Sequence, residues 1–195
     1  MLRIIKNNKL LSIIVIDTII FILIGFIIGI LLNNKTSSSI YSNLMAYIKE
    51  LSINNNYLQI FVNIGLNNSI LLLLYWIFGI SIIGILLLGI IYSYQILIFS
   101  LEIYVLFNNL NSIPFTFLLF YLISSILIMI LFFIQVYYSC SYSIILYKYL
   151  FRRGEYPLKI ITKRYLRIGF LLLICLIITI IIKIFLLYFL YPILS

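Results

Sequence analysis

Long apolar segments alternate with shorter polar ones along this chain. The apolar runs occupy residues 10–32, 69–107, 115–147 and 168–192, and polar stretches at 33–68, 108–114 and 148–167 separate them. A helix that crosses the hydrocarbon core of a bilayer needs about 20 apolar residues. The run 69–107 is nearly twice that long, at about 58 Å for 1.5 Å per residue, so it must double back.

The reversal is expected at Gly89–Gln95, because the segment LGIIYSYQ supplies glycine, serine, glutamine and tyrosines that favour the membrane interface. The pattern therefore predicts an all-α polytopic membrane bundle in a single domain, residues 1–195. About five transmembrane helices are expected, near residues 10–32, 69–90, 93–107, 115–147 and 168–192. The first run is longer than the apolar core of a signal peptide, which favours a retained helix.

Composition excludes a soluble enzyme. Of the 195 residues, 66% are hydrophobic and only 9% are charged, whereas soluble domains carry about 25% charged residues. Histidine is absent, so neither a histidine-based catalytic relay nor a clustered metal site is expected, and we expect no cofactor. The acidic residues are scattered: Asp17, Glu50, Glu102 and Glu155. Cys140 and Cys175 are interpreted as small packing residues.

Basic residues predict the orientation of the chain. With five spans and a cytoplasmic N-terminus, the inner segments hold ten lysines and arginines, seven of them in a cytoplasmic loop at 148–167, and the outer segments hold only Lys35 and Lys49. Lipid attraction accounts for the basic loop, so no nucleic-acid partner is expected. The outer loop 33–68 carries apolar residues at helical spacing, which predicts an amphipathic helix on the membrane surface. Leu44, Ile48 and Leu51 are its candidate partner-facing residues, and the alternative is that this stretch only lies on lipid.

Charges within the apolar runs are the strongest local signal, because they are unfavourable unless paired or hydrated. Depth in the membrane favours Glu102 and Lys183 as an intramembrane polar pair over Asp17. The pair could form an ion or substrate path, or it could be a structural ion pair that fixes helix register. Four glycines indicate close helix packing: Gly25 and Gly29 in a small-xxx-small motif, and Gly79 and Gly84 in the second apolar run.

The order of segments resembles that of the stage II sporulation protein M family. A basic N-terminus leads into one glycine-bearing helix, an outer loop of about 35 residues ending in IFVNIGLNNS, the block YWIFGISIIG, a long apolar hairpin, a helix running into YKYLFRR, and a last helix. The block at Leu58–Gly89, with Trp76, Gly79, Ser81 and Gly84, carries the sharpest part of the similarity.

This resemblance implies a non-catalytic protein of the inner cell membrane of endospore-forming bacteria, located in the mother-cell or septal membrane. It implies a role during engulfment, in which the protein holds two peptidoglycan-cleaving partners, sporulation proteins D and P, at the septum. Two other classes remain open. One is a small transporter or permease subunit that uses Glu102 and Lys183, and the other is a hydrophobic subunit of an organellar respiratory complex.

Overall fold

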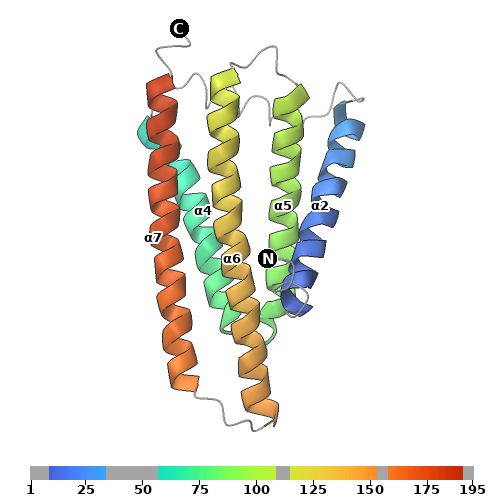
Figure 1. The fold of residues 1–195 in the computed structure, drawn as a ribbon, viewed down its shortest axis with the longest axis vertical. Helices are drawn as coiled ribbons and strands as arrows, with labels where there is room; N and C mark the ends of the chain where they lie inside the picture. The colour runs from blue at the N-terminus through green and yellow to red at the C-terminus, as the bar shows by residue number, and fades with distance from the viewer. Residues whose placement is uncertain (1–8, 34–56, 109–114, 153–157, 191–195) are drawn as a thin grey trace.

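The computed structural model describes residues 9–33, 57–108, 115–152 and 158–190. These residues form five α-helices that run alternately up and down in Figure 1: α2 (Lys9–Asn33), α4 (Tyr57–Gly79), α5 (Gly84–Asn108), α6 (Phe115–Arg152) and α7 (Leu158–Leu190). Four of them are long and apolar enough to cross a bilayer, and α4 contributes a shorter apolar stretch, Gly65–Gly79. The predicted all-α polytopic membrane bundle is confirmed.

The helices pack in a row, with α4 crossing behind it. α2 packs on α5, α5 on α6, and α6 on α7, while α4 contacts α5, α6 and α7 from the rear of the view in Figure 1. Side chains from α4, α5, α6 and α7 fill the centre, and the Tyr75 and Phe132 rings meet edge to face there, with centroids 5.6 Å apart. The most completely buried apolar side chains of this core are Leu72, Tyr75, Leu88, Ile96, Phe132, Leu176 and Ile180.

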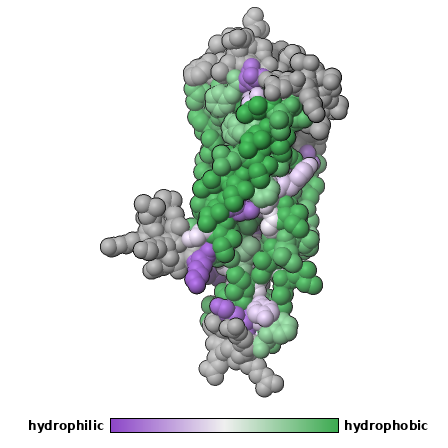
Figure 2. All heavy atoms as spheres, turned by 90° about the vertical axis from the view of Figure 1, so that its right-hand side faces the viewer, coloured by the Kyte–Doolittle hydropathy of each residue, from purple (hydrophilic) through white to green (hydrophobic). Residues whose placement is uncertain are grey.

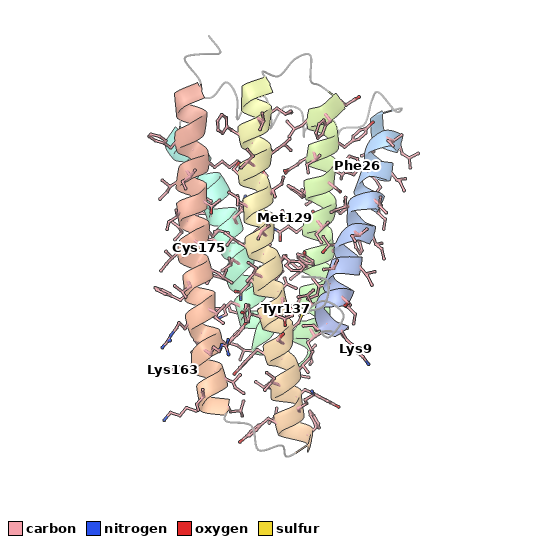
Figure 3. All side chains as sticks on the ribbon, viewed as in Figure 1. Lys9, Phe26, Met129, Tyr137, Lys163 and Cys175 are labelled. Carbon is pink, nitrogen blue, oxygen red and sulfur yellow. The ribbon has the colours of Figure 1, made fainter. Side chains whose placement is uncertain are left out.

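The outer surface of the bundle is largely apolar, as Figure 2 shows for the side formed by α2 and α5. On α2, Ile13, Ile16, Leu23 and Ile27 are all more than half exposed. So many exposed apolar side chains would be unfavourable in water, whereas a bilayer solvates them. Charged side chains gather instead at the lower end of the bundle, where Lys9 and Lys163 point outward in Figure 3.

The predicted position of the reversal is wrong. The chain turns at residues 80–83, between the end of α4 and the start of α5, and not at Gly89–Gln95. The expected helices at 69–90 and 93–107 are accordingly shifted to Tyr57–Gly79 and Gly84–Asn108. The polar residues that suggested a turn lie inside the bundle, because Tyr92 and Ser93 are buried at the contact between α5 and α2.

The two predicted polar loops are also shorter than expected. The last residues of the segment 33–68 belong to α4, and most of the segment 148–167 belongs to α6 and α7. A helix satisfies its own backbone hydrogen bonds, so α6 and α7 can continue beyond the hydrocarbon core with exposed basic side chains such as Lys148 and Lys159. The predicted amphipathic stretch with Leu44, Ile48 and Leu51 lies outside the described residues.

Candidate functional site

A cavity of about 290 Å³ lies between α4 and α5, with α6 and α7 completing its wall. α4 and α5 are close together at the turn that joins them and diverge above it, as Figure 1 shows. The polar lining of the cavity comes from four different helices and includes Asn67, Gln95, Glu102, Tyr121, Ser125 and Lys183. The fold therefore brings the two predicted intramembrane charges, Glu102 and Lys183, to one cavity.

Tyr121 on α6 contacts both charged groups. Its hydroxyl donates a hydrogen bond of 3.2 Å to Oε2 of Glu102, and its ring lies beneath Nζ of Lys183, 4.0 Å from the ring centroid. Nζ also donates to Oγ of Ser125 at 3.2 Å. Within the part of the chain that the structure describes, no direct ion pair within 4.0 Å joins Glu102 to Lys183. The two charges are thus linked through Tyr121, while the cavity adjoins both of them.

The cavity is polar at its upper end and more apolar toward the turn. Moving down the helices from Glu102 and Ser125, the lining passes to Ile91 on α5 and Ile128 on α6. Gln95 connects the cavity to the core, because its Oε1 accepts a 2.5 Å hydrogen bond from the Tyr75 hydroxyl. This arrangement suits a molecule with a polar end and an apolar end.

A second polar cluster holds the end of α4. The last carbonyl groups of a helix have no intrahelical partner, and in a membrane they need one from elsewhere. Oγ of Ser139 donates to the carbonyl of Tyr75 at 2.9 Å, and the Tyr165 hydroxyl donates to that of Trp76 at 2.7 Å. Oγ of Ser143 donates to the carbonyl of Gly79 at 2.7 Å and to that of Ser81 at 3.1 Å. Side chains of α6 and α7 therefore fix the reversal.

The glycines at this turn allow the close approach. A Cβ atom at Gly79 would overlap the Tyr165 hydroxyl, and a Cβ atom at Gly84 would overlap the Phe78 carbonyl oxygen. The Tyr165 ring in turn stacks on Tyr142, with centroids 4.4 Å apart. The block WIFGISIIG, on which the family resemblance rested, is thus the reversal between α4 and α5 together with its flanking residues.

Asp17 lies at the interface between α2 and α5. Its Oδ2 accepts a 3.0 Å hydrogen bond from Oγ of Ser93, and the neighbouring Thr18 shares a 3.0 Å hydrogen bond with the Tyr92 hydroxyl. Asp17 therefore belongs to a contact between helices and lines no part of the cavity.

Gly25 and Gly29 lie on the same interface. A Cβ atom at Gly25 would overlap Oγ of Ser100, and one at Gly29 would lie 2.5 Å from Cδ1 of Tyr104. Phe26 meets Tyr104 edge to face, with centroids 6.3 Å apart. The small-xxx-small motif therefore packs against another helix of the same chain.

The remaining candidate residues form no reactive group in the described part of the chain. Cys140 is buried and Cys175 is exposed. Among the described residues, no three cysteine or acidic side chains come together as a metal site would require. Sequence reasoning missed Tyr121 and Ser125, although their spacing of four places them on one helix face.

These features define a polytopic helical membrane protein whose polar side chains gather at a cavity, at a helix reversal and at one helix contact. The chain matches the family model for Stage II sporulation protein M over residues 18–186. It therefore belongs to that family and is a sporulation-related membrane protein. Neither a search of curated proteins nor a search of solved structures found a match.

Proposed function

We propose that this protein is a non-catalytic membrane scaffold that recruits peptidoglycan-cleaving partners and holds them at the septal membrane during engulfment. The observation that carries this proposal is the family match, which covers residues 18–186. The hydrogen bonds of three buried polar side chains support it, because Ser139, Ser143 and Tyr165 use them to hold the reversal of the chain. The partners we propose resemble sporulation proteins D and P.

We place the N-terminal end of α2 in the cytoplasm. The lower end of the bundle carries Lys9 together with Lys163, as Figure 3 shows. The exposed Lys148 and Lys159 lie near the end of α6 and the start of α7, which are at the same end in Figure 1. Basic residues collect on the cytoplasmic side of membrane proteins. In this orientation the segment 34–56 faces outward, where enzymes that act on peptidoglycan work.

The outward segment supplies the contact surface in this proposal. Apolar residues recur at helical spacing between Ile40 and Leu51, a stretch outside the described residues. Leu44, Ile48 and Leu51 are the proposed anchors, and apolar anchors of this kind typically contribute more than about 1 kcal/mol each to a contact.

The test replaces Leu44 and Ile48 together with aspartate in sporulating cells that carry a fluorescent partner hydrolase. We expect the septal signal of the hydrolase to fall while the variant remains inserted in the membrane at normal amount. A matched control replaces Ser42 and Ala46 with aspartate, which adds the same charge at the same spacing on the opposite side of the stretch. Equal septal signals in the two variants would contradict the proposed contact.

A transporter or permease subunit is the second candidate, and the cavity between Glu102 and Lys183 favours it. Replacing Glu102 with glutamine and Lys183 with methionine separates the two functions. A scaffold should still localise its partners after this double replacement, whereas complete inactivity of a stably inserted double variant would favour transport. The family match favours either of these bacterial functions over an organellar respiratory subunit.

A further inference from the structure

The Lys183 ammonium group has more hydrogen-bond donors than the surrounding protein accepts. The residue is only 5% exposed, and a lysine ammonium carries three N–H donors. Within the described chain, Ser125 is its one hydrogen-bond acceptor, and the Tyr121 ring provides a further cation–π contact. A buried cation left in this state is unfavourable. The geometry therefore calls for an additional acceptor beside Nζ.

The cavity provides the space for that acceptor. Both Lys183 and Glu102 line it, and its volume of about 290 Å³ equals that of roughly ten water molecules. Oε2 of Glu102 accepts a hydrogen bond from Tyr121, which leaves Oε1 with no partner among the described residues. A bound molecule with a negative group beside Lys183 and a hydrogen-bond donor beside Glu102 would complement both of these side chains.

The rim of the cavity indicates where the occupant comes from. Tyr94 on α5 is 64% exposed, and Asn67 on α4 is exposed as well. Both residues line the cavity, so it opens sideways between two membrane helices. An opening of this kind gives access to lipid. The side chains of Leu71, Ile91 and Ile98 line the same cavity and offer an apolar surface.

We propose that the cavity binds the head of a zwitterionic phospholipid that carries a primary ammonium group. The phosphate contacts Nζ of Lys183, and the ammonium group donates to the carboxyl group of Glu102. The lower part of the lipid lies along Leu71, Ile91 and Ile98. This proposal does not depend on the scaffold function.

The depth of the charged pair suits a lipid head. Glu102 lies six residues before the end of α5 at Asn108, a rise of about 9 Å. α5 has 25 residues and is about 37 Å long, which exceeds the hydrocarbon core of about 30 Å. With α5 centred in the core, Glu102 lies about 5 Å inside the hydrocarbon boundary, so a lipid head bound there lies slightly deeper than the heads of the surrounding leaflet.

The chemistry of the two walls predicts selectivity among lipids. Phosphatidylethanolamine supplies both the phosphate and a hydrogen-bonding ammonium group. Phosphatidylcholine has a quaternary ammonium group without an N–H donor, and phosphatidylglycerol has hydroxyl donors but no cation, so neither can donate a hydrogen bond from a cationic group to Glu102. Since such hydrogen bonds are the strong ones, we expect phosphatidylethanolamine to bind about tenfold more tightly than either.

The experiment measures lipid binding to the purified full chain by native mass spectrometry, with each of the three lipids added at equal concentration. Glu102→Gln should remove most of the preference for phosphatidylethanolamine and leave the other two lipids unchanged. Lys183→Met should weaken all three lipids about tenfold, and Lys183→Arg should restore them in part. The matched control is Lys163→Met, because this exposed lysine lies at the opposite end of the bundle.

In a Cys175→Ser background, shielding of the buried Cys140 from a maleimide reports whether each variant is folded. Equal binding of the three lipids by the native chain would overturn the proposal, and so would unchanged selectivity in folded Glu102→Gln. Binding of free phosphoethanolamine, a soluble zwitterion without acyl chains, is measured in the same way to distinguish a lipid from a soluble ligand. Binding of free phosphoethanolamine as tight as that of the lipid would overturn the assignment to a lipid, whereas binding at least tenfold weaker supports it.

Discussion

Adding one methyl group at Gly25 should push α2 away from α5. A Cβ atom there would overlap Oγ of Ser100, and it would lie 2.9 Å from Cβ of Ser100 and 3.0 Å from the Leu97 carbonyl oxygen. The carbonyl belongs to the backbone of α5, so relief requires the helices to separate. Overpacking of this kind costs about 1–3 kcal/mol.

Gly89 provides the matched control, because a Cβ atom at that position would meet nothing within 4 Å. In a helix, alanine is more favourable than glycine by about 1 kcal/mol at both positions. The difference in stability between Gly25→Ala and Gly89→Ala therefore measures the cost of the overlap alone. The overlap is expected to lower the free energy of unfolding by about 2 kcal/mol. Since Tm changes by about 2–4 °C per kcal/mol in a protein of this size, Gly25→Ala should melt about 6 °C below Gly89→Ala.

The assay uses the thiols of the chain. In a Cys175→Ser background, the buried Cys140 reacts with a fluorogenic maleimide only when the bundle opens, so the reaction reports Tm in detergent. Ser100→Gly should recover part of the loss in the Gly25→Ala background, since it removes both contacts to Ser100. Equal Tm values for Gly25→Ala and Gly89→Ala would refute the packing described for α2.

Three further predictions follow from the polar contacts and from the orientation. Ser143→Ala leaves the carbonyl of Gly79 without its 2.7 Å partner, so Tm should fall by an amount corresponding to about 1–3 kcal/mol; an unchanged Tm would show that this bond does not hold the reversal. Glu102→Gln combined with Lys183→Met should lower Tm less than either change alone, because a single change leaves one uncompensated charge; a double variant less stable than both single variants would refute this coupling. A cysteine placed at position 159 of a cysteine-free chain should resist an impermeant maleimide in intact cells, and labelling from outside would reverse the proposed orientation.

The number of long helices in the described part of the chain could be predicted because a bilayer imposes a length on each of them. The first apolar run was expected at residues 10–32, and α2 occupies Lys9–Asn33. The run 69–107 was correctly expected to double back, since no single helix of that length fits one crossing. Its turn could not be placed, because hydropathy stays high through residues 80–83 and the polar residues further on belong to a buried contact with α2.

The cavity could be predicted only in part. Glu102 and Lys183 were identifiable because charge within an apolar run is rare. Tyr121 could not be singled out among 17 tyrosines, and its role depends on α6 lying between α5 and α7. That order follows from tertiary packing of helices whose apolar residues surround them on all sides, so no periodic pattern in the sequence encodes it.

The localisation of a partner hydrolase in cells that lack this protein tests the central proposal most directly. A fluorescent hydrolase resembling sporulation protein P is followed during engulfment, and its total amount is measured in the same cells. The scaffold proposal predicts that the hydrolase is made in normal amount and fails to gather at the septum. Normal septal localisation in these cells would contradict the proposal.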